Sequence, residues 1–100
     1  MARLRFSACS RSDLEGIWER IAADSVRNAD AVHERLYGRC LLLRSHPRCG
    51  HRRDEVKLGL RSLSSDGYAI FHRCVGMTVH ISRIIHHSRD LTAIDFDEQP

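Results

Sequence analysis

The sequence has no apolar run that approaches the ~20 residues a helix needs to cross a bilayer. Its first seven residues, Met-Ala-Arg-Leu-Arg-Phe-Ser, lack the apolar region of a signal peptide. We therefore expect a cytoplasmic protein with no membrane partner. The four cysteines are widely spaced and include no C-x-x-C pair, so we expect no disulfide framework in that compartment.

Positive and negative charges are nearly balanced, because the formal net charge is only +3. A charge this small does not by itself indicate nucleic-acid binding, and we expect no sequence-specific DNA recognition by this chain alone. An apolar fraction of 42% and a charged fraction of 29% are typical of a globular protein rather than a disordered one. The 100 residues predict one small domain, with residues 95–100 as a frayed acidic tail.

Residues 57–91 predict three strands rich in β-branched, aromatic and aliphatic residues. The runs 57–63, 67–75 and 78–91 are separated only by Ser64–Gly67 and by Gly76-Met77. Breaks this short allow hairpins alone, so the runs predict an antiparallel meander. Each run also carries arginine or histidine, which a fully buried sheet would not use. We therefore expect one face or one end of the sheet to be open and basic.

Before the meander, the pattern predicts a strand and two helices. Residues 3–8 alternate polar and apolar side chains, which indicates a short strand at the edge of the later sheet. Ser12 to Glu15 reads as a capping box, and an apolar stripe follows at helical spacing. Ser25 can cap a second helix, which Pro47 ends. Residues 44–56 read as a polar loop, and residues 88–96 can form a last short helical turn.

The predicted fold class is therefore α+β. An N-terminal strand precedes an α-helical hairpin, and a three-stranded antiparallel meander follows, with the helices packed on one face of the sheet.

In the order and spacing of several short segments, the chain resembles the ParE branch of the RelE/ParE toxin superfamily. The resemblance runs through residues 8–21, His46-Pro47 with Gly50, residues 59–63, residues 68–73, residues 81–86 and Arg89-Asp90-Leu91. It implies the toxin of a type II toxin–antitoxin module that a ParD-like antitoxin neutralises in a hetero-oligomeric complex. ParE-like members are associated with inhibition of DNA gyrase, whereas RelE-like members cleave messenger RNA on the ribosome. No tyrosine follows Leu91, which departs from the nuclease pattern.

Two groups of residues are candidates for binding. The cations of the meander form the first group and would contact gyrase: Arg61, Arg83, His86, His87 and Arg89. Arg61, Arg83 and His86 would serve the nuclease alternative, and edge-strand charges that prevent aggregation are the structural alternative. Apolar residues of the helical hairpin form the second group, for the antitoxin or simply for the core: Leu14, Trp18, Ile21, Leu36 and Leu43.

One loop also resembles a metal site. His46, Cys49 and His51 lie close together, but the spacing supplies no fourth ligand for zinc. We expect neither a metal nor another cofactor. The leading hypothesis is a gyrase-inhibiting toxin that is not an enzyme. The alternatives are a ribosome-dependent endoribonuclease and a degenerate member that still binds antitoxin without being toxic.

Overall fold

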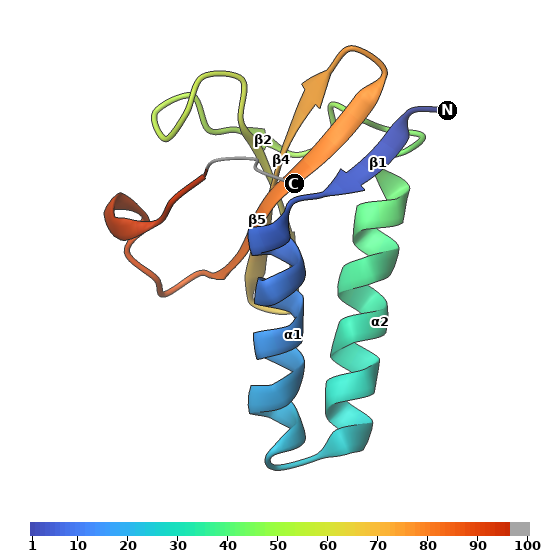
Figure 1. The fold of residues 1–100 in the computed structure, drawn as a ribbon, viewed down its shortest axis with the longest axis vertical. Coiled ribbons are helices and arrows are strands. Elements are labelled where there is room, and N and C mark those ends of the chain that lie inside the picture. Colours follow the sequence, from blue (N-terminus) through green and yellow to red (C-terminus); the bar gives the residue numbers. More distant parts are fainter. Residues whose placement is uncertain (97–100) are drawn as a thin grey trace.

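The computed structural model describes residues 1–96 and contains two helices and five strands. The elements are β1 (Arg3–Phe6), α1 (Ala8–Ala22), α2 (Val26–Leu42), β2 (His51–Arg52), β3 (Arg61–Ser65), β4 (Tyr68–Val75), β5 (Thr78–His86) and a 3-10 turn (Leu91–Ala93). The sheet has the order β1-β5-β4-β3-β2 (Figure 1). β1 is parallel to β5, whereas the other pairs are antiparallel. The predicted α+β class, the meander and the edge position of β1 are therefore confirmed.

The turn between β3 and β4 explains the tight first hairpin. Asp66 and Gly67 have φ values of 55° and 83°, both in the left-handed region. Two such residues make a hairpin turn whose twist matches that of the flanking strands. β3 itself begins at Arg61, later than the predicted start at Lys57. The preceding residues turn instead, because the Gly59 N–H donates to the Asp54 carboxylate and the Leu60 N–H to the Lys57 carbonyl.

The helix starts are set by two serines, of which sequence analysis found one. Ser25 caps α2 as predicted, since its Oγ accepts a hydrogen bond from the Asn28 N–H at 3.1 Å. α1 begins at Ala8, where the Ser7 Oγ accepts from the Ser10 N–H at 3.0 Å. The predicted capping box of Ser12 and Glu15 is therefore wrong, because both residues lie inside a helix that has already begun.

Two apolar cores cover the sheet, one on each face. The larger core packs the helices on the sheet: Leu14, Ile17, Leu36, Cys40, Leu43, Leu63, Tyr68, Ile70, Val79, Ile81 and Ile84. The smaller core lies on the opposite face and consists of Leu60, Ala69, Phe71, Ile85 and Phe96, with Val56, Leu91 and Ile94 packed against it. The expectation of an open sheet face is therefore wrong, because the chain covers that face with its own loop and C-terminal segment.

Phe96 shows how the second core closes. Its ring lies 4.9 Å from that of Phe71 in an edge-on contact, and the residue is only 7% exposed. The predicted tail therefore does not begin at residue 95, because Phe96 is packed. The remainder of that prediction concerns residues 97–100, which lie outside the described residues.

The two helices run side by side, and their connected end extends beyond the sheet (Figure 1). In this half, the helices can pack only on each other. No helix within residues 1–96 is long and apolar enough to cross a membrane.

Two features of the fold had no counterpart in the sequence analysis. Residues 44–56, predicted as a loop, contain the two-residue strand β2, which pairs with β3. Gly50 has a φ of 101°, and a Cβ there would collide with the Ser62 carbonyl. Glycine is therefore required where this loop approaches β3.

Candidate functional site

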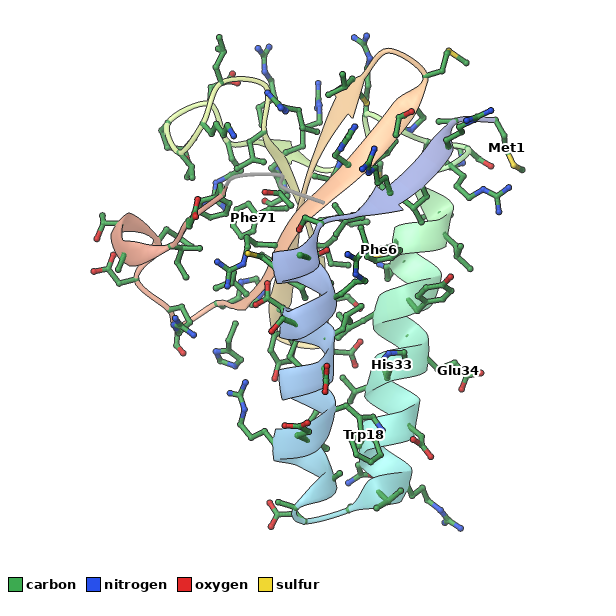
Figure 2. The ribbon with its side chains drawn as sticks, viewed as in Figure 1. Met1, Phe6, Trp18, His33, Glu34 and Phe71 are labelled. Atoms are coloured by element: carbon green, nitrogen blue, oxygen red, sulfur yellow. The ribbon has the colours of Figure 1, made fainter. Side chains whose placement is uncertain are left out.

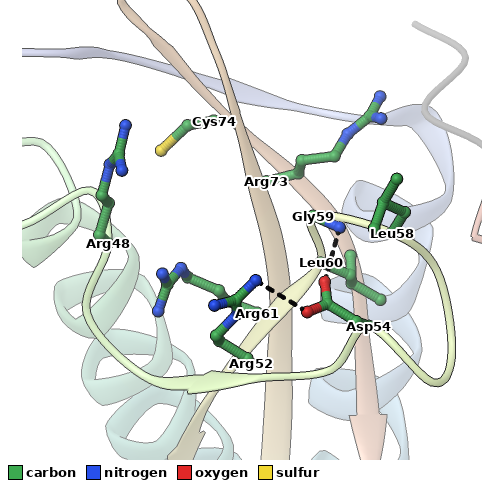
Figure 3. A pocket seen from close by; sticks show the side chains of 9 residues that line it. All are labelled: Arg48, Arg52, Asp54, Leu58, Gly59, Leu60, Arg61, Arg73 and Cys74. Carbon is green, nitrogen blue, oxygen red and sulfur yellow. Dashed lines mark hydrogen bonds and ion pairs between the residues drawn. The ribbon is translucent and has the colours of Figure 1, made fainter.

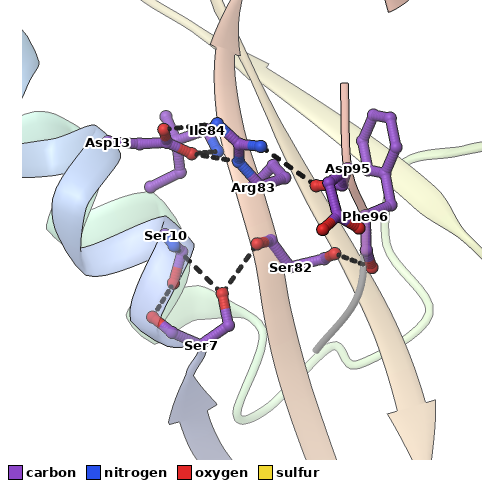
Figure 4. A network of polar contacts seen from close by, with 8 residues as sticks. All are labelled: Ser7, Ser10, Asp13, Ser82, Arg83, Ile84, Asp95 and Phe96. Carbon is purple, nitrogen blue, oxygen red and sulfur yellow. Dashed lines mark hydrogen bonds and ion pairs between the residues drawn. The ribbon is translucent and has the colours of Figure 1, made fainter. Parts of the chain in front are cut away.

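A network of polar contacts joins α1, β5 and the C-terminal segment; we call it the α1–β5 seam (Figure 4). β1 ends at Phe6, opposite Ile81, so the rest of β5 has no strand on that side. Side chains of the first two turns of α1 take its place. The Ser7 Oγ donates to the Ser82 carbonyl at 2.7 Å, and Asp13 accepts from the Ile84 N–H at 3.0 Å. The seam therefore satisfies backbone groups that an exposed strand edge would leave unpaired.

Arg83 lies at the centre of the seam. Its Nε and Nη2 donate to the two oxygens of Asp13 at 2.8 and 2.9 Å, and its Nη1 donates to the Asp95 carbonyl at 3.0 Å. The side chains of Arg83 and Asp13 are only 17% and 14% exposed, and the hydrogen bonds to Asp13 raise the pKa of Arg83. The expectation that Arg83 is exposed is therefore wrong, because the side chain is largely buried and each of its three nitrogens donates within the fold, whereas its role in target binding stays a prediction.

The remaining predicted cations lie at opposite ends of the sheet. Arg61 pairs with His72 in one half of β4, whereas His86 pairs with Tyr68 at the other end. His86 contacts the Tyr68 ring edge-on at 5.2 Å and forms a hydrogen bond with Ser88. His87 and Arg89 are exposed beside it. The five predicted target-binding residues therefore do not form one cluster.

The predicted antitoxin-binding residues divide by burial. Leu36 and Leu43 are completely buried, and Leu14 is 7% exposed, so these three belong to the core. Trp18 and Ile21 are half-buried. Of the predicted set, therefore, only the residues toward the protruding end of the hairpin retain substantial exposed surface.

A groove lies along this hairpin and contains Trp18, which Figure 2 shows between the two helices. This hairpin groove has a volume of about 740 Å³ and is lined by Arg11, Leu14, Glu15, Trp18, Glu19, Asp30 and His33. The Trp18 indole N–H donates to Asp30 at 2.8 Å, which fixes the ring across the hairpin. The lining contains three carboxylates and one arginine, which makes the groove acidic. Leu14 and Trp18 provide its apolar surface.

Aromatic rings continue the groove toward β1. His33 and Tyr37 are stacked with centroids 6.5 Å apart, and Tyr37 stacks on Phe6 at 5.8 Å. Sequence analysis missed Asp30, His33 and Tyr37. A signal was present, because spacings of three and four residues place them on one face of α2. The predicted antitoxin-binding residues follow apolar stripes, whereas this face is mixed polar and aromatic.

A second concavity, the basic pocket, lies at the β2–β3–β4 end of the sheet (Figure 3). Its volume is about 350 Å³, and it is lined by Arg48, Arg52, Asp54, Leu58, Gly59, Leu60, Arg61, Arg73 and Cys74. Of the predicted target-binding residues, Arg61 alone contributes to it. Sequence analysis missed the other three arginines because they come from a loop, β2 and β4.

His72 lies near this pocket and is completely buried. Within residues 1–96, neither ring nitrogen meets the geometry of a hydrogen bond, although the Cys49 backbone lies close enough to the ring to oppose part of the fall in its pKa. Burial lowers its pKa from 6.5 to about 4, with a further contribution from the nearby positive charge of Arg61. The ring is therefore neutral at pH 7. Among residues 1–96, no three histidine, cysteine or acidic side chains are placed to hold a metal ion, including the His46, Cys49 and His51 loop.

Comparison with known proteins identifies the family. Residues 4–91 match the family described as the ParE toxin of the type II toxin–antitoxin system parDE. The chain belongs to the ParE toxin family. It is 29% identical to the toxin ParE1 of Caulobacter vibrioides over 101 residues, which covers 93% of this chain and 97% of that protein.

Two solved structures show that this ParE-family chain has the fold of its relatives. A structure of the chromosomal ParDE system from P. aeruginosa matches with a TM-score of 0.75 and 19% identity, covering 86% of this chain and 96% of that one. The RelBE2 toxin–antitoxin complex of Mycobacterium tuberculosis matches with a TM-score of 0.52 and 27% identity, covering 86% of this chain and 98% of the other. The predicted membership of the RelE/ParE superfamily is confirmed.

Proposed function

We propose that this ParE-family toxin inhibits DNA gyrase and is neutralised when a cognate antitoxin binds it directly. The observation that carries the proposal is the match to the ParE family over residues 4–91. The Caulobacter toxin, similar over nearly its whole length, supports the same assignment. On this account the toxin is not an enzyme, and it acts by occupying a surface of its target.

The ribonuclease alternative is disfavoured by the sheet face opposite the helices. A RelE-like nuclease would gather cations on an open face of this sheet. Here Leu60, Phe71, Ile85 and Phe96 fill that face. Arg83, one of the three predicted catalytic residues, is held by Asp13. The absence of a tyrosine after Leu91 also disfavours the nuclease alternative.

The hairpin groove is the proposed antitoxin surface. Trp18 offers a large, half-buried ring held by Asp30, and aromatic residues of this kind dominate the binding free energy of many interfaces. Glu15, Glu19 and Asp30 surround it with negative charge. The complementary partner is an amphipathic segment whose apolar side chains contact Leu14 and Trp18 and whose basic side chains face these carboxylates.

The proposed target-binding residues are the predicted cations that are exposed or half-exposed, which form two separate groups without Arg83. Arg61 lies in the basic pocket, whereas His86 ends β5 and His87 and Arg89 follow it. These side chains add little to stability at the surface, so they are available for recognition.

Supercoiling by purified gyrase tests the function. The purified toxin should inhibit supercoiling or trap cleaved DNA, and antitoxin mixed with the toxin beforehand should abolish the effect. A parallel reaction with translating ribosomes provides the contrast. Unchanged supercoiling together with cleavage of ribosome-bound message would reject the gyrase proposal in favour of the nuclease.

The antitoxin surface is tested by a Trp18→Ala variant in a binding titration. Loss of the ring should weaken antitoxin binding at least ~30-fold, since aromatic hot spots contribute about 2 kcal/mol or more. Met77→Ala is a matched control, because Met77 is 73% exposed at the β4–β5 turn and distant from the groove in the sequence and sheet. Equal binding by the two variants would place the antitoxin elsewhere.

A further inference from the structure

The basic pocket brings together four arginines from separate parts of the chain. Arg48 comes from the loop after α2, and Arg52, Arg61 and Arg73 come from β2, β3 and β4. Figure 3 shows their side chains around one concavity. The same pocket contains one carboxylate, that of Asp54. The four arginine residues thus line a space of about 350 Å³, which is large enough for a phosphate group and its attached atoms.

These residues account for the whole charge excess of the chain. The sequence has 16 basic and 13 acidic residues. Four arginines and one aspartate of the pocket carry a net +3, which leaves twelve basic and twelve acidic residues elsewhere. The molecule is therefore close to neutral outside the pocket. Positive charge concentrated in a concavity focuses the electric field and attracts anions.

Contacts within the fold neutralise only part of this charge. Arg52 forms an ion pair with Asp54 at 3.1 Å, and the Gly59 N–H donates to the other oxygen of Asp54 at 2.9 Å. The Gly59 N–H and the Arg52 guanidinium lower the pKa of Asp54. Within residues 1–96, Arg48 and Arg61 have neither an ion pair nor a side-chain hydrogen bond. Two arginines of the pocket therefore keep all their donors available.

Strand pairing also brings two of these positive charges close together. Arg52 and Arg61 are directly opposite each other in the β2–β3 pair. Like charges at opposed positions of a sheet destabilise the pairing. Asp54, which pairs with Arg52 and whose pKa the charge of Arg61 also lowers, is the one carboxylate in the lining of the pocket and offsets only part of this repulsion. An anion between the guanidinium groups would convert this repulsion into attraction.

We propose that the basic pocket is a binding site for a phosphate group. Guanidinium groups donate paired hydrogen bonds that match phosphate oxygens, and a phosphate can accept from several arginines at once. Leu58, which is 81% exposed, forms an apolar wall beside the charges and suits the sugar or base that carries a phosphate. Nothing in the pocket is arranged to read a base sequence, so the site binds nucleotides or nucleic-acid strands through their phosphates.

The test uses the purified full-length toxin without antitoxin or gyrase, so its outcome does not depend on the proposed function. Binding of fluorescein-labelled duplex DNA and of labelled single-stranded RNA is followed by anisotropy over a range of salt concentrations. Unlabelled pyrophosphate competes in a second series. These arms distinguish a duplex, a single strand and a free phosphate as the source of the bound group.

The decisive variant combines Arg48→Gln with Arg61→Gln, because neither side chain has an ion pair or hydrogen bond to lose within the described residues. It should bind the best phosphate ligand roughly tenfold more weakly, and the salt dependence of log K should become shallower by about one to two. The control combines Arg20→Gln with Arg27→Gln, two exposed helix arginines, and removes the same charge. It should bind like the unchanged protein.

Three results would overturn the proposal. One is an equal loss in the two variants, which would show only a general charge effect. Another is the absence of binding to all three phosphate ligands at low salt. The third is displacement of the ligand by a short polyaspartate peptide as effectively as by pyrophosphate, since the pocket would then be a site for acidic protein segments.

Discussion

The α1–β5 seam and the basic pocket both place arginine beside β4, but they use it in opposite ways. Arg83 pairs across the strand with Phe71, and Arg61 pairs with the next residue, His72, from the other side. Arg83 gives its hydrogen bonds to Asp13 and Asp95, whereas Arg61 has no such partner within residues 1–96. The comparison teaches that a cation in a strand indicates function only where the fold has not already used its donors.

The largest effect on stability is expected when the carboxylate of Asp13 is removed. Asp13→Ala leaves Arg83 without its carboxylate and the Ile84 N–H without its acceptor. We expect a loss of about 3 kcal/mol in the free energy of unfolding, since breaking a largely buried ion pair leaves an uncompensated charge. Urea denaturation measures it, with Glu19→Ala on the exposed side of the same helix as control. A loss no larger than that of the control would mean that the seam contributes little to the fold.

Near the basic pocket, His72 should instead make the free energy of unfolding depend on pH. Its pKa is lowered from 6.5 to about 4 in the folded protein, so the unfolded chain binds more protons between these values. Stability should therefore fall as the pH falls through this range, by about 2 kcal/mol between pH 7 and pH 5. The pKa values of Asp54, Glu55, Asp66 and Asp90 are also lowered in the folded protein, from ordinary values that already lie below pH 5.

Urea denaturation of the unchanged protein and of His72→Leu at pH 7 and pH 5 separates this contribution. The variant should lose most of the pH dependence. If the variant and the unchanged protein lose the same stability at pH 5, then the acid sensitivity arises elsewhere and His72 is not an unpaired buried base.

A smaller effect is expected where the seam meets the second core. The buried Ser82 Oγ donates to the Phe96 carbonyl at 2.8 Å. Ser82→Ala should cost about 1 kcal/mol of unfolding free energy, the usual value of one buried hydrogen bond. Ser64→Ala, on an exposed position of β3, provides the control. Equal stability of both variants would show that this contact does not hold the C-terminal segment on the sheet.

Much of the fold followed from local signals in the sequence. Short breaks with glycine predicted the hairpins, and the Ser25 cap predicted the start of α2. A last helical turn was predicted within residues 88–96, and the 3-10 turn lies there, capped by Asp90, which accepts hydrogen bonds from the N–H and hydroxyl of Thr92. Each of these features depends on residues only a few positions apart, so the sequence carries them directly.

The sites were harder to predict because their partners are far apart in the chain. Asp13 and Arg83 are separated by 70 residues, and nothing near either one indicates the ion pair. Phe96 looked like part of an acidic tail because its packing partner, Phe71, lies in β4. The basic pocket combines arginines from four segments that are separated in the sequence. Such groupings depend on strand order and loop path, which periodicity does not reveal.

The most direct test of the comparison is to measure the unfolding free energies of Arg61→Gln and Arg83→Gln side by side in urea at pH 7. Both substitutions remove one guanidinium group from a strand of the same meander. Arg83→Gln should lose about 2 kcal/mol, since hydrogen bonds between charged groups are broken. Arg61→Gln should change stability by less than about 0.5 kcal/mol. Equal losses would contradict the division between an arginine that holds the fold and one that is free to bind.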